Sequence, residues 1–124
     1  MSLRASAALQ EPVVERTSSL SRAGREWIVG PGARLLGLTD LQARVLATCL
    51  ESRSFTLDWL WRSVGSSKQA AQDTLARLQR RGLMELTAGV REGRYNRRVA
   101  VMGSSLRALL SSVEGARSEA EAAS

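Results

Sequence analysis

The sequence predicts a mainly helical α+β fold that contains one small β-hairpin. Between residues 39 and 81, apolar residues recur at three- and four-residue spacing, which is the period of helices that bury one face. Residues 84–102 break this period, and two short strand-like runs surround a glycine-bounded loop there. A chain of 124 residues, 44% of them hydrophobic, has room for one small domain of this kind and its tails.

The N-terminal region has the weakest pattern. Residues 1–20 are rich in Ser, Ala and Glu without a sustained period, so we expect a mobile tail. Residues 21–37 are expected to form a short helix and a linker. Gly30-Pro31-Gly32 ends the helix, because proline lacks the N–H of the helical ladder and glycine favours turns.

The first predicted helix of the domain proper begins at Thr39. Thr39 and Gln42 fit a capping box, in which each side chain accepts a hydrogen bond from the other residue's backbone. Apolar residues at four-residue spacing then give one broad buried face. Cys49 lies in that face, and we interpret it as a small core residue, because a redox-sensing thiol needs an exposed, electropositive setting.

The second predicted helix spans residues 56–64 and places an apolar stripe toward the core. Trp59 lies on another face of this helix. We expect it to pack against the N-terminal segment around Trp27; the alternative is an aromatic side chain that contacts a partner.

The third predicted helix begins at Ser66 or Ser67 and ends before Gly82, a typical C-terminal stop. Ser66 and Gln69 fit a second capping box. The buried stripe of this helix consists of Ala71, Leu75 and Leu78.

The remaining segments complete a recognisable order of elements. Strands are expected over residues 84–88 and 98–102, a helix over residues 104–113, and a mobile tail over residues 114–124. Two helices joined by a tight turn and followed by a basic hairpin make a winged helix-turn-helix, which we assign to residues 38–113 with short flanking helices. In that layout the second helix of the pair enters the major groove of DNA, and the hairpin, or wing, reaches the flanking backbone.

The distribution of charge supports this interpretation. The net charge of +6 and the isoelectric point near 11.2 favour a polyanionic partner, of which nucleic acid is the commonest. Residues 56–82 carry five basic against two acidic groups, and residues 83–103 carry four against two. The helix-turn-helix and the wing therefore hold +5 of the +6. No apolar run approaches the roughly 18 residues of a membrane span, so we expect no membrane partner.

Two sets of polar side chains are candidates for contact with double-stranded DNA. Glutamine can bridge adenine, lysine can donate to guanine, and serine can bind phosphate or base in the major groove. Arginine suits phosphates and the narrow minor groove. The candidates on the third helix (about residues 67–81) are Ser67, Lys68, Gln69 and Gln72, and those on the wing (about residues 89–98) are Arg91, Arg94, Tyr95, Arg97 and Arg98.

Asp73 is the one acidic residue on the predicted reading face. We expect it to pair with Arg77, four residues further along the helix. The alternative is that its carboxylate accepts a hydrogen bond from cytosine N4.

Three motifs resemble the MarR (multiple antibiotic resistance) family of transcriptional regulators. Residues 38–46, LTDLQARVL, are similar to the family's Leu-Thr-x-x-Gln-x-x-Val-Leu opening. Residues 67–83 resemble its recognition helix and closing Arg-Gly-Leu. Asn96-Arg97-Arg98 stands where the family wing carries Asp-Arg-Arg, so this chain departs from the family pattern at Asn96.

The resemblance implies a homodimer with Lys68, Gln69 and Gln72 in the major groove. It also implies that Arg97 or Arg98 enters the minor groove. Family members dimerise through long terminal helices, for which residues 20–29 and 104–113 are brief substitutes.

Composition argues against catalysis and bound metal. Histidine is absent and Cys49 is the only cysteine, which removes the usual general base and leaves no intramolecular disulfide. We therefore expect a protein of the reducing cytoplasm that is not an enzyme and needs no cofactor. The leading hypothesis is a sequence-specific DNA-binding transcriptional regulator. The alternative is a winged-helix adaptor that contacts proteins within a larger nucleoprotein assembly of transcription, replication or a phage.

Overall fold

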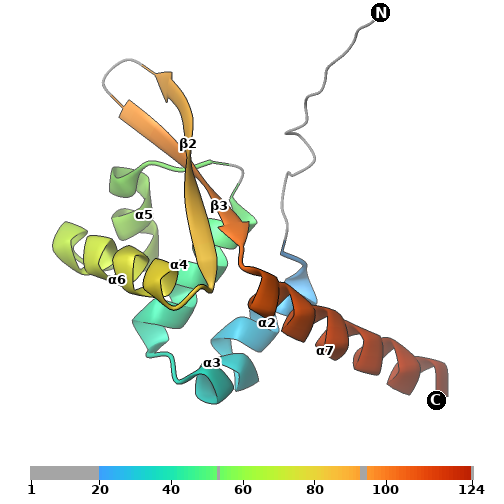
Figure 1. Cartoon of the computed structure of the whole chain (residues 1–124). Helices are drawn as coiled ribbons and strands as arrows, with labels where there is room; N and C mark the ends of the chain where they lie inside the picture. Colours follow the sequence, from blue (N-terminus) through green and yellow to red (C-terminus); the bar gives the residue numbers. More distant parts are fainter. Residues whose placement is uncertain (1–19, 53, 93–94, 124) are drawn as a thin grey trace, which may run out of the picture.

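The computed structural model describes residues 20–52, 54–92 and 95–123, with the backbone alone at 88–92, 95–96 and 117–123. Its elements in chain order are α2 (Arg22–Val29), α3 (Pro31–Leu36), α4 (Asp40–Glu51), α5 (Leu57–Val64), α6 (Lys68–Arg80), β2 (Met84–Glu92), β3 (Tyr95–Met102) and α7 (Ser104–Ala123). The hairpin β2–β3 projects from the helices, and α7 extends away from them on the other side (Figure 1). The tail predicted for residues 1–20 lies outside the described residues, except for Leu20, which is buried in the core.

Helix α4 is the centre of the core. It packs against α2, α5, α6 and β3. The capping box predicted at its start is confirmed: the Gln42 N–H donates to Thr39 Oγ1 at 3.1 Å, and the Thr39 N–H donates to Gln42 Oε1 at 3.0 Å. Its buried residues are Ala43, Val45, Leu46, Ala47, Cys49 and Leu50. The predicted position and buried face of this helix are therefore confirmed.

The predicted linker before α4 is in fact helical. Helix α2 ends at Gly30 as expected, but Pro31 then begins α3. Proline is favoured at the first helical position, because no intrahelical acceptor awaits an N–H there and its fixed φ is already helical. Gly32 is required beside the Trp27 ring, since a Cβ at this position would lie 2.6 Å from it.

Trp59 does not pack around Trp27, so that prediction is wrong. The Trp59 side chain is 45% exposed. It borders a surface hollow whose other lining residues all belong to α5 or its N-cap: Thr56, Asp58, Arg62 and Ser63. The alternative, an aromatic side chain open to a partner, fits this position.

The hairpin is longer than its hydrophobic pattern indicated. β2 and β3 pair antiparallel from Met84↔Met102 to Ala88↔Arg98, pass an irregularity, and pair again at Arg91↔Asn96 and Glu92↔Tyr95. The loop predicted over residues 89–96 is therefore mostly strand. Backbone pairing carries the strands through a stretch whose sequence has no alternating apolar pattern, and such pairing does not depend on that pattern.

Helix α7 also exceeds its prediction. It runs to Ala123, whereas the sequence suggested an end at residue 113 and a mobile tail after it. Leu106 and Leu110 bury its first half against the core. The Ala- and Glu-rich second half lacks an apolar stripe, but these residues have high helix propensity and prolong the helix. Among the described residues, no helix is both long enough and apolar enough to cross a membrane.

Two glycines give a matched test of this packing. Gly103 joins β3 to α7; its N–H donates to Leu83 O at 3.0 Å, and an added Cβ would collide with the Gly82 carbonyl. Gly103→Ala is expected to lower the free energy of unfolding in urea by about 1–3 kcal/mol, as overpacking does. In α7, a Cβ on Gly115 would meet nothing within 4 Å. Gly115→Ala should therefore raise stability by about 0.8–1 kcal/mol; equal effects of the two changes would contradict the packing described.

Cys49 is expected to be inert in the folded protein. Burial raises the pKa of its thiol from 9.0 to about 12, so at pH 8 the thiolate is roughly a thousandfold scarcer than in an exposed cysteine. A maleimide reagent should label Cys49 only at the rate of unfolding, and urea should release full reactivity. Rapid labelling of the native protein would contradict the core assignment.

The same thiol should make stability depend on pH. Because the pKa of Cys49 is raised in the folded protein, the free energy of unfolding should fall as pH rises from about 9 to about 12. Cys49→Ala should remove this part of the pH dependence.

Candidate nucleic-acid interface

Helices α5 and α6 form a helix-turn-helix whose turn depends on Gly65. Gly65 ends α5 in the left-handed conformation, at φ 72°, where a side chain would be strained. Ser67 then caps α6, its hydroxyl accepting from the Ala70 N–H at 3.1 Å. The capping box predicted from Ser66 to Gln69 is wrong: the helix begins one residue later, and Gln69 no longer occupies the third helical position.

The core fixes which side of α6 faces outward. Ala71, Leu75 and Leu78 are buried as predicted, and Thr74 joins them. The opposite side is open to solvent, particularly over the first two turns. The exposed polar residues there are Ser67, Lys68, Gln69, Gln72 and Asp73. The structure thus brings together all four candidates that the sequence assigned to this helix.

Asp73 is bonded to Gln69 and not to Arg77. Gln69 Nε2 donates to Asp73 Oδ1 at 2.9 Å, across one turn of α6. The predicted Asp73–Arg77 pair is therefore wrong, because the Asp73 carboxylate accepts a hydrogen bond from Gln69, four residues earlier in the helix. An amide nitrogen carries two hydrogens, so Gln69 keeps one donor and its carbonyl acceptor for another partner.

The two wing arginines whose side chains are described have different surroundings. Successive residues of a strand point to opposite faces, so Arg97 and Arg98 diverge. Arg97 is half-buried: its Nε donates to Ser54 Oγ at 2.8 Å and its Nη2 to Ser54 O at 3.2 Å. The guanidinium therefore ties β3 to the segment that precedes α5.

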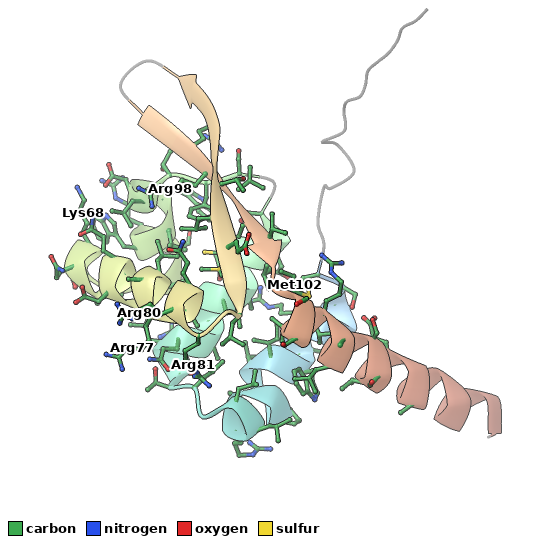
Figure 2. The ribbon with its side chains drawn as sticks, viewed as in Figure 1. Lys68, Arg77, Arg80, Arg81, Arg98 and Met102 are labelled. Carbon is green, nitrogen blue, oxygen red and sulfur yellow. The ribbon has the colours of Figure 1, made fainter. Side chains whose placement is uncertain are left out.

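Arg98 is exposed and lies on the same side of the molecule as Lys68 (Figure 2). Its backbone is fixed, because the Phe55 N–H donates to Arg98 O at 2.9 Å and the Arg98 N–H donates to Phe55 O at 2.8 Å. Its side chain lines a surface hollow between α6 and the hairpin together with Gln79, Leu86 and Thr87. The wing and the recognition helix therefore share one polar surface.

Gln79 is a member of this surface that the sequence analysis missed. The candidates predicted from the sequence cover only the N-terminal half of the helix. Gln79 follows Gln72 by seven residues, two helical turns, so the helical period alone places it on the same side. That period was the available signal.

The remaining wing candidates fall where side chains are not described. Arg91 and Tyr95 belong to β2 and β3 by their backbone, at the end of the hairpin. Arg94 lies outside the described residues. Within the described part of the chain, no cluster of three His, Cys, Asp or Glu side chains is arranged to hold a metal ion.

Three solved structures are similar to this arrangement. A mutant of MepR from S. aureus matches with a TM-score of 0.54 and 14% identity, over 77% of this chain and 69% of that one. Transcriptional regulator PA4135 matches with a TM-score of 0.52 and 18% identity, over 79% and 71% of the two chains. AbfR, in a disulfide form, gives a TM-score of 0.50 and 20% identity, over 77% of this chain and 64% of that one.

The chain has a MarR-like winged-helix fold. The three regulators are of the MarR type, and the likeness to them confirms the fold predicted from the sequence. At 14–20% identity the likeness concerns fold alone. No protein-family model matches the sequence, and no curated protein is significantly similar to it.

Substitution of the two described arginines of this MarR-like wing, Arg97 and Arg98, should have different effects on stability. Arg97→Gln removes a charged, half-buried donor to Ser54, so the free energy of unfolding in urea should fall by about 1–2 kcal/mol. Arg98→Gln changes an exposed side chain and should alter it by less than about 0.5 kcal/mol. Ser54→Ala, which keeps the carbonyl acceptor, is expected to cause a loss of unfolding free energy between these two values. Equal losses for Arg97→Gln and Arg98→Gln would contradict the anchoring contact.

Proposed function

We propose that this protein is a sequence-specific double-stranded DNA-binding transcriptional regulator that is not an enzyme and requires no cofactor. One observation carries the proposal. The exposed N-terminal side of α6 bears Lys68, Gln69 and Gln72, and Arg98 of the wing faces the same way (Figure 2). Hydrogen-bonding side chains on a helix beside a basic hairpin form the pattern that reads the major groove and grips the neighbouring backbone.

The dimensions of α6 support insertion into DNA. A helix with its side chains is about 10–12 Å across, and the major groove is about 12 Å wide. In this arrangement Gln69 and Gln72 present an amide donor and a carbonyl acceptor to adenine, and Lys68 donates to guanine O6 or N7. Ser67, whose hydroxyl oxygen caps the helix, keeps its hydrogen for a phosphate oxygen.

The wing is proposed to contact phosphates and the minor groove. Arg98, which is exposed and lines the hollow that Gln79 of α6 borders, is proposed to supply one cation, and Arg91, Arg94 and Tyr95 are proposed to supply further contacts. Arg97 was a sequence candidate for the same contact. Its bonds to Ser54 favour a different role, in which Arg97 holds the wing at the angle that lets Arg98 reach DNA.

We further propose that the functional unit is a homodimer on a pseudo-palindromic site. Two copies related by a two-fold axis present two recognition helices, which bind half-sites about one helical turn apart. The resemblance of residues 38–113 to the MarR family, whose members dimerise, supports this proposal.

A protein-binding adaptor is the second candidate function. The exposed Trp59, with Arg62 and Asp58 on the same helix, favours it. Tryptophan and arginine are among the residues that most often anchor protein interfaces. An adaptor of this kind would not need to bind DNA when it is purified alone.

Selection from a random duplex library at physiological salt tests the proposal. A palindromic motif is the expected product, and its half-site spacing reports the dimer geometry. If the protein binds duplexes from the library but no sequence motif emerges, its binding depends on DNA shape alone. No retention at all would reject the DNA proposal in favour of the adaptor.

Two substitutions should then distinguish a residue that reads a base from one that contacts phosphate. Gln72→Ala is expected to relax discrimination at one base pair of each half-site by about 1–3 kcal/mol, with little change on unrelated DNA. Arg98→Ala should weaken binding to every sequence alike and reduce the salt slope by about 1 per protomer. Fluorescence anisotropy on the selected site and its single-base variants measures both. Identical sequence profiles for the two variants would contradict these roles.

A further inference from the structure

A second basic surface lies at the other end of α6. Arg77, Arg80 and Arg81 occupy its last turn and C-cap, and all three are exposed. Figure 2 shows them together below the helix axis, whereas Lys68 and Arg98 lie above, toward the wing. We refer to Arg77, Arg80 and Arg81 as the arginine edge.

Helical phase separates the arginine edge from the wing. Lys68, Gln72 and Gln79 fall along one flank of α6, and Gln79 borders the hollow that Arg98 lines. Arg77 and Arg81, four residues apart, fall along the other flank. Arg81 contacts α3 on that side, where its guanidinium donates to the Leu36 carbonyl. Arg80 lies between the two flanks, on the outward ridge.

The charge of the arginine edge is not neutralised within the described part of the chain. The ion pairs found there join Arg22 to Glu26, Arg25 to Glu51 and Arg44 to Asp40. The nearest carboxylate on α6, Asp73, is taken by Gln69.

Stabilisation of the helix end does not account for all three residues. Cations in the last turn suit the negative end of the helix dipole. Arg81 already supplies such a cation and is fixed by Leu36. Arg77 and Arg80 form no ion pair or side-chain hydrogen bond with any described residue. Two adjacent guanidinium groups are thus left open to solvent beside the proposed reading face.

From this arrangement we infer that Arg77 and Arg80 bind phosphates of the DNA strand that borders the major groove opposite the wing. The inference rests on the proposed function. A helix lying in the groove has a sugar-phosphate strand on each side, and the wing accounts for one of them. Guanidinium groups match phosphate oxygens in pairs, which suits the side that the wing leaves uncontacted.

An acidic protein is the other class of partner that such a surface fits. The position of the arginine edge favours DNA, because it continues along the same 13-residue helix that bears the reading residues. A phosphate strand follows the edge of the groove and therefore reaches both ends of the helix. If this surface bound a protein instead of DNA, substitutions of Arg77 and Arg80 would leave the salt dependence of DNA binding unchanged.

The salt dependence of DNA binding tests the inference on the full chain. The probes are a labelled duplex of random sequence and, once selected, the preferred site. Arg77→Gln/Arg80→Gln should reduce the slope of log K against log salt by about 2 per bound protomer, on both duplexes alike. Arg77→Lys/Arg80→Lys keeps the charges and should retain most of the slope. Arg22→Gln, which removes one cation from a 93% exposed side chain on α2, is the control and should change nothing.

Ethylation interference on the wild-type protein gives a second readout that needs no variant. Interfering phosphates are expected on both strands that border the major groove of each half-site. Interference confined to the wing side, or an unchanged slope in the glutamine variant, would overturn the inference while leaving the proposed function intact. Wild-type protein that binds neither duplex would overturn both.

Discussion

Burial of α4 is the constraint on which the rest of the structure depends. Val45, Leu46 and Cys49 are completely inaccessible to solvent, and Leu50 almost so. The valine and leucine side chains among them each contribute about 1.5–3 kcal/mol when removed from water. Because α4 packs against α2, α5, α6 and β3 at once, it sets the position of both halves of the candidate interface.

The core positions the candidate interface through a few direct contacts. The stripe of α6 that packs inward leaves Lys68 and Gln72 outward, and the Phe55–Arg98 bridge holds the wing beside them. Arg97 strengthens the same junction through Ser54. Because Arg97 is engaged in this contact and Arg98 is exposed, the two adjacent arginines have different surroundings, and only Arg98 is proposed to contact DNA. The arginine edge adds cations on the side of α6 that the wing does not reach.

Much of the fold was predictable because its signals are local. Thr39 and Gln42 cap α4 within one turn, Gly65 ends α5, and Gly82 follows α6 at φ 74°. The elements that escaped prediction lack a buried pattern of their own. Helix α3 begins on the same Gly-Pro-Gly that ends α2, the outer hairpin is held by backbone pairing, and the second half of α7 depends on helix propensity. A hydrophobic period detects none of these.

The winged-helix order of elements, the inward face of α6 and the concentration of positive charge can all be predicted from the sequence, because local spacing and composition encode them. Which partner each polar side chain has depends on the folded chain. Asp73 had two neighbours within reach on its own helix, and Gln69 holds it. Arg97 and Arg98 are adjacent in sequence, but only the folded chain places Ser54 beside one and the hollow of Gln79 beside the other. Contacts such as that of Arg97 with Ser54, 43 positions apart, are set by packing, and no local pattern encodes them.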